Sequence, residues 1–158
     1  MRKRSRFLVL FCTLFASLAS RGLGAQINVR AVRALTFGTV IPGVPSVVLR
    51  TDPLNSGRFE IRGGQFLTII RLTFTLPTVL NGPTGATMPL TFATNDAGYS
   101  FTNSINNQTA FNPNQPYTTV KGIGGGATGV FLGGRVTPAV NQRAGSYTGT
   151  VVLSVVVL

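Results

Sequence analysis

The sequence GSYTGTVVLSVVVL, residues 145–158, has no charged residue and no proline and is rich in β-branched side chains. In an extended strand its odd-numbered positions share one face, which is apolar from Tyr147 to Val157. The opposite face becomes apolar only towards its end. This alternation predicts a deeply buried strand. Because an uncovered strand of this kind would be an aggregation template, we expect other strands to cover both of its faces and to pair with both of its edges.

A second alternating stretch lies at residues 26–38 (QINVRAVRALTFG), whose first eight residues (26–33) we term the N-terminal arm. Ile27, Val29 and Ala31 share the apolar face of the arm, and Arg33 interrupts that face. The interruption predicts that the strand bends, or that its first pairing ends, near Ala31 to Arg33. We expect the arm to lie along the edge of the C-terminal strand, either in the same molecule or in a neighbouring one.

A third alternating stretch, residues 66–76 (FLTIIRLTFTL), predicts another long strand. We expect this strand and its sheet partners to pack on the face of the C-terminal strand. Shorter alternating runs predict further strands, which Gly, Pro and Asn turns separate at spacings near ten residues: 46–50, 58–62, 88–92 and 130–136. The polar residues 94–118 are the least regular and predict a long loop with one short strand. About eight strands and no helical period beyond residue 25 predict an all-β sandwich.

The chain begins with a basic segment followed by twelve apolar residues, 7–18, and small residues up to Ala25. This pattern is typical of a secretory signal peptide and is too short for a stable transmembrane helix. We expect cleavage after Ala25, or a few residues away, which leaves residues 26–158 as one domain. An uncleaved N-terminal anchor is the alternative. The expected location is therefore secreted: the periplasm, the outer surface or the extracellular space.

The charge of the mature chain is lower than that of the whole sequence. Five of the fourteen Lys and Arg residues lie within residues 1–25, which leaves nine against three acidic residues and a charge of +6. These basic residues are scattered, apart from Arg58 and Arg62 on either side of Glu60. The pattern does not favour nucleic acid as a partner. It fits a solvated surface or a mild affinity for anionic cell-surface polymers.

The composition argues against an enzyme and against a cofactor or metal site. The sequence has no histidine, and its single cysteine, Cys12, lies in the expected signal peptide. The usual general base, thiolate nucleophile and common metal ligands are therefore missing from residues 26–158. Asp52 and Asp96 occupy turn sequences and read as turn-capping residues, although a calcium site near Asp96 is conceivable. We expect no catalytic, cofactor-binding or metal-binding residues.

Two motifs resemble a known family. Residues 35–43 (LTFGTVIPG) resemble the opening of a bacterial family of small secreted pilin-like domains of unknown function, similar to spore coat protein U and to archaic chaperone–usher pilus subunits. Residues 145–149 (GSYTG), with Gly133, Gly134 and Gln142 before them, resemble the closing strand of that family. The sequence departs from pilins at Val157, where they have an aromatic residue, and in lacking their disulfide cysteines in residues 26–158.

The resemblance implies an immunoglobulin-like, pilin-like β-sandwich that acts as a non-catalytic pilus or coat subunit. It implies strand complementation between the arm (26–33) and the C-terminal strand (145–158), with copies of itself or related subunits and a periplasmic chaperone and usher as partners. The alternative is a monomeric, self-complemented sandwich that binds carbohydrate or another surface component through its loops, chiefly 94–118. The residues assigned to strand complementation are Ile27, Val29, Ala31, Gly145, Tyr147, Val151, Leu153, Val155 and Val157.

Overall fold

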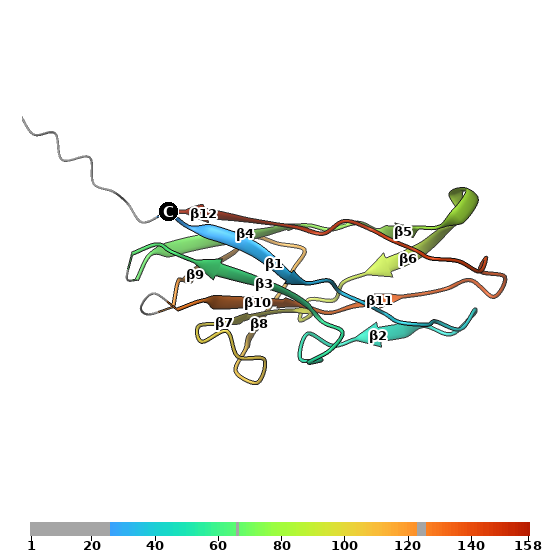
Figure 1. Cartoon of the computed structure of the whole chain (residues 1–158), viewed down its shortest axis with the longest axis horizontal. Coiled ribbons are helices and arrows are strands. Elements are labelled where there is room, and N and C mark those ends of the chain that lie inside the picture. The colour runs from blue at the N-terminus through green and yellow to red at the C-terminus, as the bar shows by residue number, and fades with distance from the viewer. Residues whose placement is uncertain (1–25, 66, 123–125) are drawn as a thin grey trace, which may run out of the picture.

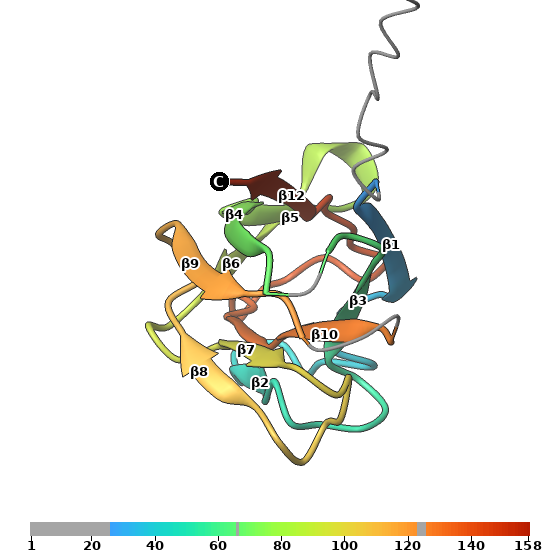
Figure 2. The ribbon, with the colours of Figure 1, turned by 90° about the vertical axis from the view of Figure 1, so that its left-hand side faces the viewer.

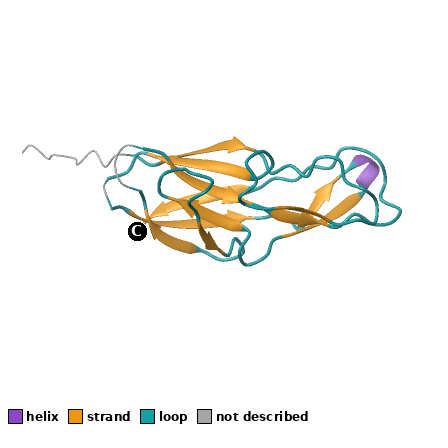
Figure 3. Ribbon diagram, turned by 90° about the horizontal axis from the view of Figure 1, so that it is seen from below, coloured by secondary structure: helices purple, strands orange, loops and turns teal. Residues whose placement is uncertain are grey.

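A computed structural model describes residues 26–65, 67–122 and 126–158, and the signal peptide expected in residues 1–25 lies outside these ranges. The described residues form antiparallel β-sheets with one short 3₁₀ turn, η1 (Pro83–Gly85), so the all-β class is as predicted (Figure 3). None of their helical segments is long and apolar enough to span a membrane. The twelve strands of this part of the chain are β1 (Asn28–Arg33), β2 (Ser46–Val48), β3 (Gly57–Arg62), β4 (Ile69–Thr75), β5 (Val79–Asn81), β6 (Thr87–Thr91), β7 (Ala97–Ser100), β8 (Thr109–Phe111), β9 (Tyr117–Val120), β10 (Thr128–Leu132), β11 (Gly134–Val136) and β12 (Val152–Val157).

Two sheets enclose the larger hydrophobic core, in the arrangement of a sandwich. One sheet has the strand order β1-β3-β10-β7-β8, and the other has the order β12-β4-β9 (Figure 2). Alternate side chains from both sheets meet in this first core, which is what the period-2 patterns predict. Its buried members are Phe59, Ile61, Ile70, Leu72, Ala97, Tyr99, Phe111, Val130, Leu132 and Leu153.

A third sheet, with the order β2-β11-β6-β5, extends the molecule along its long axis (Figure 1). Gly133 separates β11 from β10, at a place where a Cβ would lie less than 3.0 Å from the backbone of Val48 and Arg50. The second core beneath this sheet is small. Its fully buried members are only Met88, Leu90 and Val136 among the residues described, with Phe37, Val40, Leu80, Phe92 and Tyr147 packed against them and partly exposed.

The C-terminal strand is covered less completely than the sequence predicts. β12 pairs with β4 along its whole length, and Leu153 is buried in the first core. Its other face is open, because Val152 and Val156 are about half exposed. Within the described residues no other strand pairs with β12. The expectation of cover on both faces and both edges is therefore wrong for a single molecule, which covers one face and pairs one edge.

The expected positions of the two stretches beside β12 are both wrong. β4 (Ile69–Thr75), which lies within the 66–76 stretch, pairs with the edge of β12 instead of packing on its face, while β3 and β10 of the opposite sheet contribute to the core under that face. The N-terminal arm forms β1 and pairs with β3 instead of β12. Its register shifts between Ala31 and Arg33, so the ladder is irregular where the sequence predicts a bend or an end of the first pairing, and pairing continues to Arg33.

The region 94–118 contains more strand than predicted. It holds all of β7 and β8 and the beginning of β9, in place of one short strand. Tyr99 and Phe111 of these strands are buried in the first core. The strands predicted within 46–50, 58–62, 88–92 and 130–136 are present as β2, β3, β6 and the pair β10 and β11.

Candidate functional site

Two carboxylates lie in turns, as the sequence predicts. Asp52 accepts hydrogen bonds from the backbone N–H groups of Leu54 and Asn55 at 2.8 and 2.9 Å and from the Asn55 side chain at 3.0 Å. These bonds, led by the one from the Asn55 side chain, hold the pKa of Asp52 below its usual value. Asp96 accepts a hydrogen bond from the N–H of Ala93 at 2.7 Å. In the described ranges no group of three or more His, Cys, Asp or Glu residues is placed to hold a metal ion.

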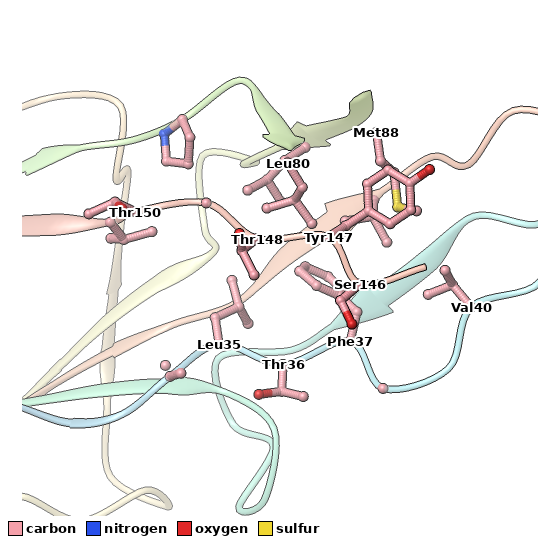
Figure 4. A pocket seen from close by; sticks show the side chains of 18 of the residues that line it. Leu35, Thr36, Phe37, Val40, Leu80, Met88, Ser146, Tyr147, Thr148 and Thr150 are labelled. Atoms are coloured by element: carbon pink, nitrogen blue, oxygen red, sulfur yellow. The ribbon is translucent and has the colours of Figure 1, made fainter. Parts of the chain in front are cut away.

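A groove of about 1070 Å³ runs between two segments of the chain. One wall is the segment 31–40, which continues from β1, and the other is the segment 143–151, which leads into β12. Figure 4 shows the two walls facing each other, with Leu35 and Phe37 on one side and Tyr147 and Thr148 on the other. The floor consists of core side chains from four strands: Phe59, Met88, Leu90, Leu132 and Val136.

Each wall of the groove has backbone hydrogen bonds on its outer side. Thr36 donates its N–H to the carbonyl of Asn55 at 2.9 Å, in the segment that leads into β3. Thr148 exchanges two hydrogen bonds with Asn81 at the end of β5. No backbone hydrogen bond of the described residues joins the two walls to each other. The groove therefore has an apolar floor, and the backbone of its two walls has no hydrogen-bonded partner on the groove side among the described residues. An added β-strand can pair with such free backbone groups.

A side-chain network holds the wall that contains Tyr147 in place. The Tyr147 hydroxyl accepts a hydrogen bond from Gln142 Nε2 at 2.6 Å and donates one to the Arg143 carbonyl at 2.7 Å. Gln142 also donates to the carbonyl of Thr87, at 3.1 Å, at the start of β6. The Tyr147 ring lies against Gly82, where a Cβ would be less than 3.0 Å from three ring atoms. The ring thus anchors this wall over the second core.

The structure divides the residues assigned to strand complementation between two places. Four of them line the groove: Ala31, Gly145, Tyr147 and Val151. The other five lie outside it. Ile27, Val29 and Val155 pack against the first core, Leu153 is buried within it, and Val157 is about half exposed.

Sequence reasoning missed several groove residues. Leu35, Phe37 and Val40 line one wall, and Leu80 and Met88 line the side towards the third sheet. The alternation of Leu35 and Phe37 and their place in the 35–43 motif were the available signals. No pattern in the sequence indicates that their neighbouring edge lacks a strand.

Comparison with protein-family models, with curated proteins and with solved structures found no match for this chain. The functional conclusions below therefore rest on the residues and geometry of the chain itself.

Proposed function

We propose that this chain is a non-catalytic, exported structural subunit of a pilus-like or coat-like assembly, built as an immunoglobulin-like, pilin-like sandwich. The observation that carries this proposal is the groove between segments 31–40 and 143–151, whose two walls share no backbone hydrogen bond with each other among the described residues. A β-strand from another subunit fills the groove and pairs with both walls. Such strand addition provides affinity through the backbone and specificity through alternate side chains.

The chemistry of the groove favours an apolar, extended occupant. Its floor includes the fully buried side chains Val136 and Leu132 and the nearly buried Met88. A strand laid in the groove would cover the partly exposed Phe37, Val40 and Leu80 of its lining, at about 25 cal/mol for each Å² of apolar surface removed from water. It would also satisfy the free N–H and C=O groups of both walls. At about 3.3 Å per residue, the seven residues 31–37 that precede the positive φ of Gly38 correspond to an extended occupant of about 23 Å.

The N-terminal arm of a neighbouring copy is the donor we propose. Its alternating Ile27, Val29 and Ala31 are apolar side chains with the spacing that a groove floor requires. In the single chain the arm is engaged in β1, where it pairs with β3. Donation to a neighbour therefore requires release of this ladder, as in domain swapping. Related subunits and a periplasmic chaperone and usher are the other partners of the proposed assembly, which forms at the cell surface after export.

The monomeric carbohydrate-binding alternative has less support. It relies on residues 94–118 as a free loop, and β7 and β8 fix two parts of that stretch in the five-stranded sheet. The exposed connection between these two strands, residues 101–108, remains available to it.

The experiment that tests the proposal is expression of residues 26–158 and electrophoresis of the unheated protein on a denaturing gel. Donor-strand exchange predicts a ladder of multimers that collapses to a monomer on boiling. Deletion of residues 26–33 should abolish the ladder and lower solubility, because both β1 and the donor strand are lost. A stable monomer that never forms a ladder would refute assembly by strand exchange.

A further inference from the structure

A compact group of charged side chains lies on the outer face of the five-stranded sheet, away from the groove. Arg58, Glu60 and Arg62 alternate along β3 and therefore share one face of the sheet. Arg30 of β1 is the cross-strand partner of Glu60. Three guanidinium groups thus surround one carboxylate.

Glu60 binds all three arginines. Its Oε2 lies 3.1 Å from Arg62 Nη2 and 3.5 Å from Arg30 Nη2, and its Oε1 lies 3.4 Å from Arg58 Nη2. Asn103 Nδ2 donates a further hydrogen bond to Oε1 at 3.0 Å. The hydrogen bond from Asn103, followed by that from Arg62, holds the pKa of Glu60 below its usual value. The carboxylate is therefore charged at neutral pH.

The backbone around the cluster is shaped to hold Asn103 there. Asn103 has a positive φ of 57°, a conformation that asparagine tolerates better than most residues. Its Oδ1 accepts a hydrogen bond from Arg58 Nε at 3.3 Å. Gly129, opposite Glu60 on β10, makes room for it, since a Cβ at that position would be 2.6 Å from Asn103 Oδ1. The ring of Phe131 lies 5.8 Å from the Arg58 guanidinium and orients it further.

The cluster of three arginines and one carboxylate has a net charge of +2. The Glu60 side chain is only 7% exposed, whereas those of Arg30 and Arg62 are 65% and 60% exposed. A guanidinium has five N–H donors. In the described residues Arg30 uses one nitrogen, and Arg62 two, in side-chain hydrogen bonds. Both arginines therefore present unused donors to solvent, and a shared internal anion holds them close together.

We propose that Arg30 and Arg62 form a binding site for the carboxylate or sulfate groups of an acidic polysaccharide. The guanidinium fork matches such oxyanions in geometry and charge. A polymer with one acidic group per sugar or disaccharide can place a single group on this isolated cluster. A nucleic acid would need a continuous basic track, with roughly six to ten phosphate contacts for tight binding. Arg33 and Arg50 do not extend such a track, because they bind backbone carbonyls of loops, and Lys121 is buried. Arg71 and Arg135 lie on β4 and β11, in the other two sheets.

This site lies away from the groove and does not rest on the proposed assembly. It exists while the N-terminal arm, which carries Arg30, is paired with β3. It also differs from the carbohydrate-binding alternative, because it uses a sheet face instead of the loops. Donation of the arm to a neighbour would separate Arg30 from Glu60 and Arg62, so the site belongs to the chain before strand exchange.

The test uses purified mature chain and two polyanionic probes, dextran sulfate and polygalacturonate, with neutral dextran as the reference. The variant Arg30→Ala with Arg62→Ala removes the site. The pair Arg71→Ala with Arg135→Ala is the matched control, because these exposed arginines lie on β4 and β11 and their loss changes the net charge equally. Thermal unfolding of both variants verifies that they are folded.

We expect the site variant to bind one or both polyanions at least tenfold more weakly than the natural chain. The control variant should lose less than twofold in affinity. Binding of one probe alone identifies the favoured group as sulfate or carboxylate. Equal losses in the two variants would overturn the proposal in favour of diffuse net charge. Absence of binding to both probes would overturn the proposal outright. Duplex DNA that binds as tightly as the polyanions, and that loses binding equally when Arg30 and Arg62 are replaced, would overturn the choice of a polysaccharide.

Discussion

Thr148 and Asn81 exchange two backbone hydrogen bonds, of 2.7 and 2.9 Å, and so form an antiparallel pair between the groove wall and the end of β5. In such a pair both backbone groups of Thr148 point towards β5. Those of the adjacent residues, Tyr147 and Gly149, consequently point the opposite way, to the groove. The pair explains how the segment 143–151 is bound to β5 on one side while its backbone groups on the other side face the groove.

The contact between Gly82 and the Tyr147 ring should be sensitive to a single added methyl group. The variant Gly82→Ala places a Cβ less than 3.0 Å from the ring and displaces the wall. We expect a loss of about 1–3 kcal/mol in the free energy of unfolding, measured by urea titration. Gly126→Ala is the matched control, because a Cβ there meets nothing within 4 Å. Equal stability of the two variants would contradict the anchoring role of Tyr147.

Glu60 should contribute to stability only while it is charged. Its pKa is lowered in the folded chain, first by Asn103 and then by Arg62. A carboxyl group of this kind stabilises the fold above its unfolded pKa, about 4.3, and this contribution is lost as the pH falls through the folded pKa. We therefore expect Glu60→Gln to be less stable than the natural chain at pH 7.

The difference between Glu60→Gln and the natural chain should shrink steadily below pH 4. Urea unfolding at a series of pH values measures it. Asp52→Asn provides a comparison, because the lowered pKa of Asp52 predicts the same direction at a site remote from the arginine cluster. If Glu60→Gln lowers the free energy of unfolding as much at low pH as at pH 7, then the packing of Glu60, and not its charge, is responsible for its contribution.

The alternation of apolar and polar residues along the chain made much of this fold predictable. The buried side of β12 follows from the period-2 placement of Val151, Leu153 and Val155, because successive side chains of a strand point to opposite faces. The irregular pairing between Ala31 and Arg33 lies where an arginine interrupts an apolar face. The turns at Asp52 and Asp96 follow from their local chemistry.

Strand partners were not predictable in the same way. Apolar and polar residues alternate in both β1 and β4, so either strand could pair with the edge of β12. Which of the two pairs there depends on the arrangement of the whole sheet. β7 (Ala97–Ser100) has a sequence, AGYS, without β-branched residues, so its pairing with β10 determines that it is a strand. The groove was missed for a related reason, because it arises where a strand is absent between two walls.

A peptide that copies the N-terminal arm should bind in the groove. We expect the sequence QINVRAVR, residues 26–33, to raise the melting temperature of the mature chain, because a ligand of the folded state stabilises it. At a concentration one hundred times its Kd the gain is about 2.7 kcal/mol. A control peptide with Ile27→Asp and Val29→Asp should have no effect. Stabilisation by both peptides alike would contradict recognition through the apolar face of the arm.

The central claim is that the arm leaves β3 of its own chain and enters the groove of the next. Asn28 and Arg62 are opposed in the β1–β3 ladder and both are exposed, so Asn28→Cys with Arg62→Cys permits a disulfide that locks the arm in place. Residues 26–158 contain no other cysteine. Each single-cysteine variant is the control for disulfides between molecules.

The decisive measurement is the multimer ladder of this double-cysteine variant on an unheated denaturing gel, after refolding under oxidising and under reducing conditions. We predict monomer alone when the disulfide is closed, and a ladder like that of the natural chain when it is reduced. A ladder of equal extent under both conditions would contradict the claim, because the arm would then be held on β3 while assembly proceeds.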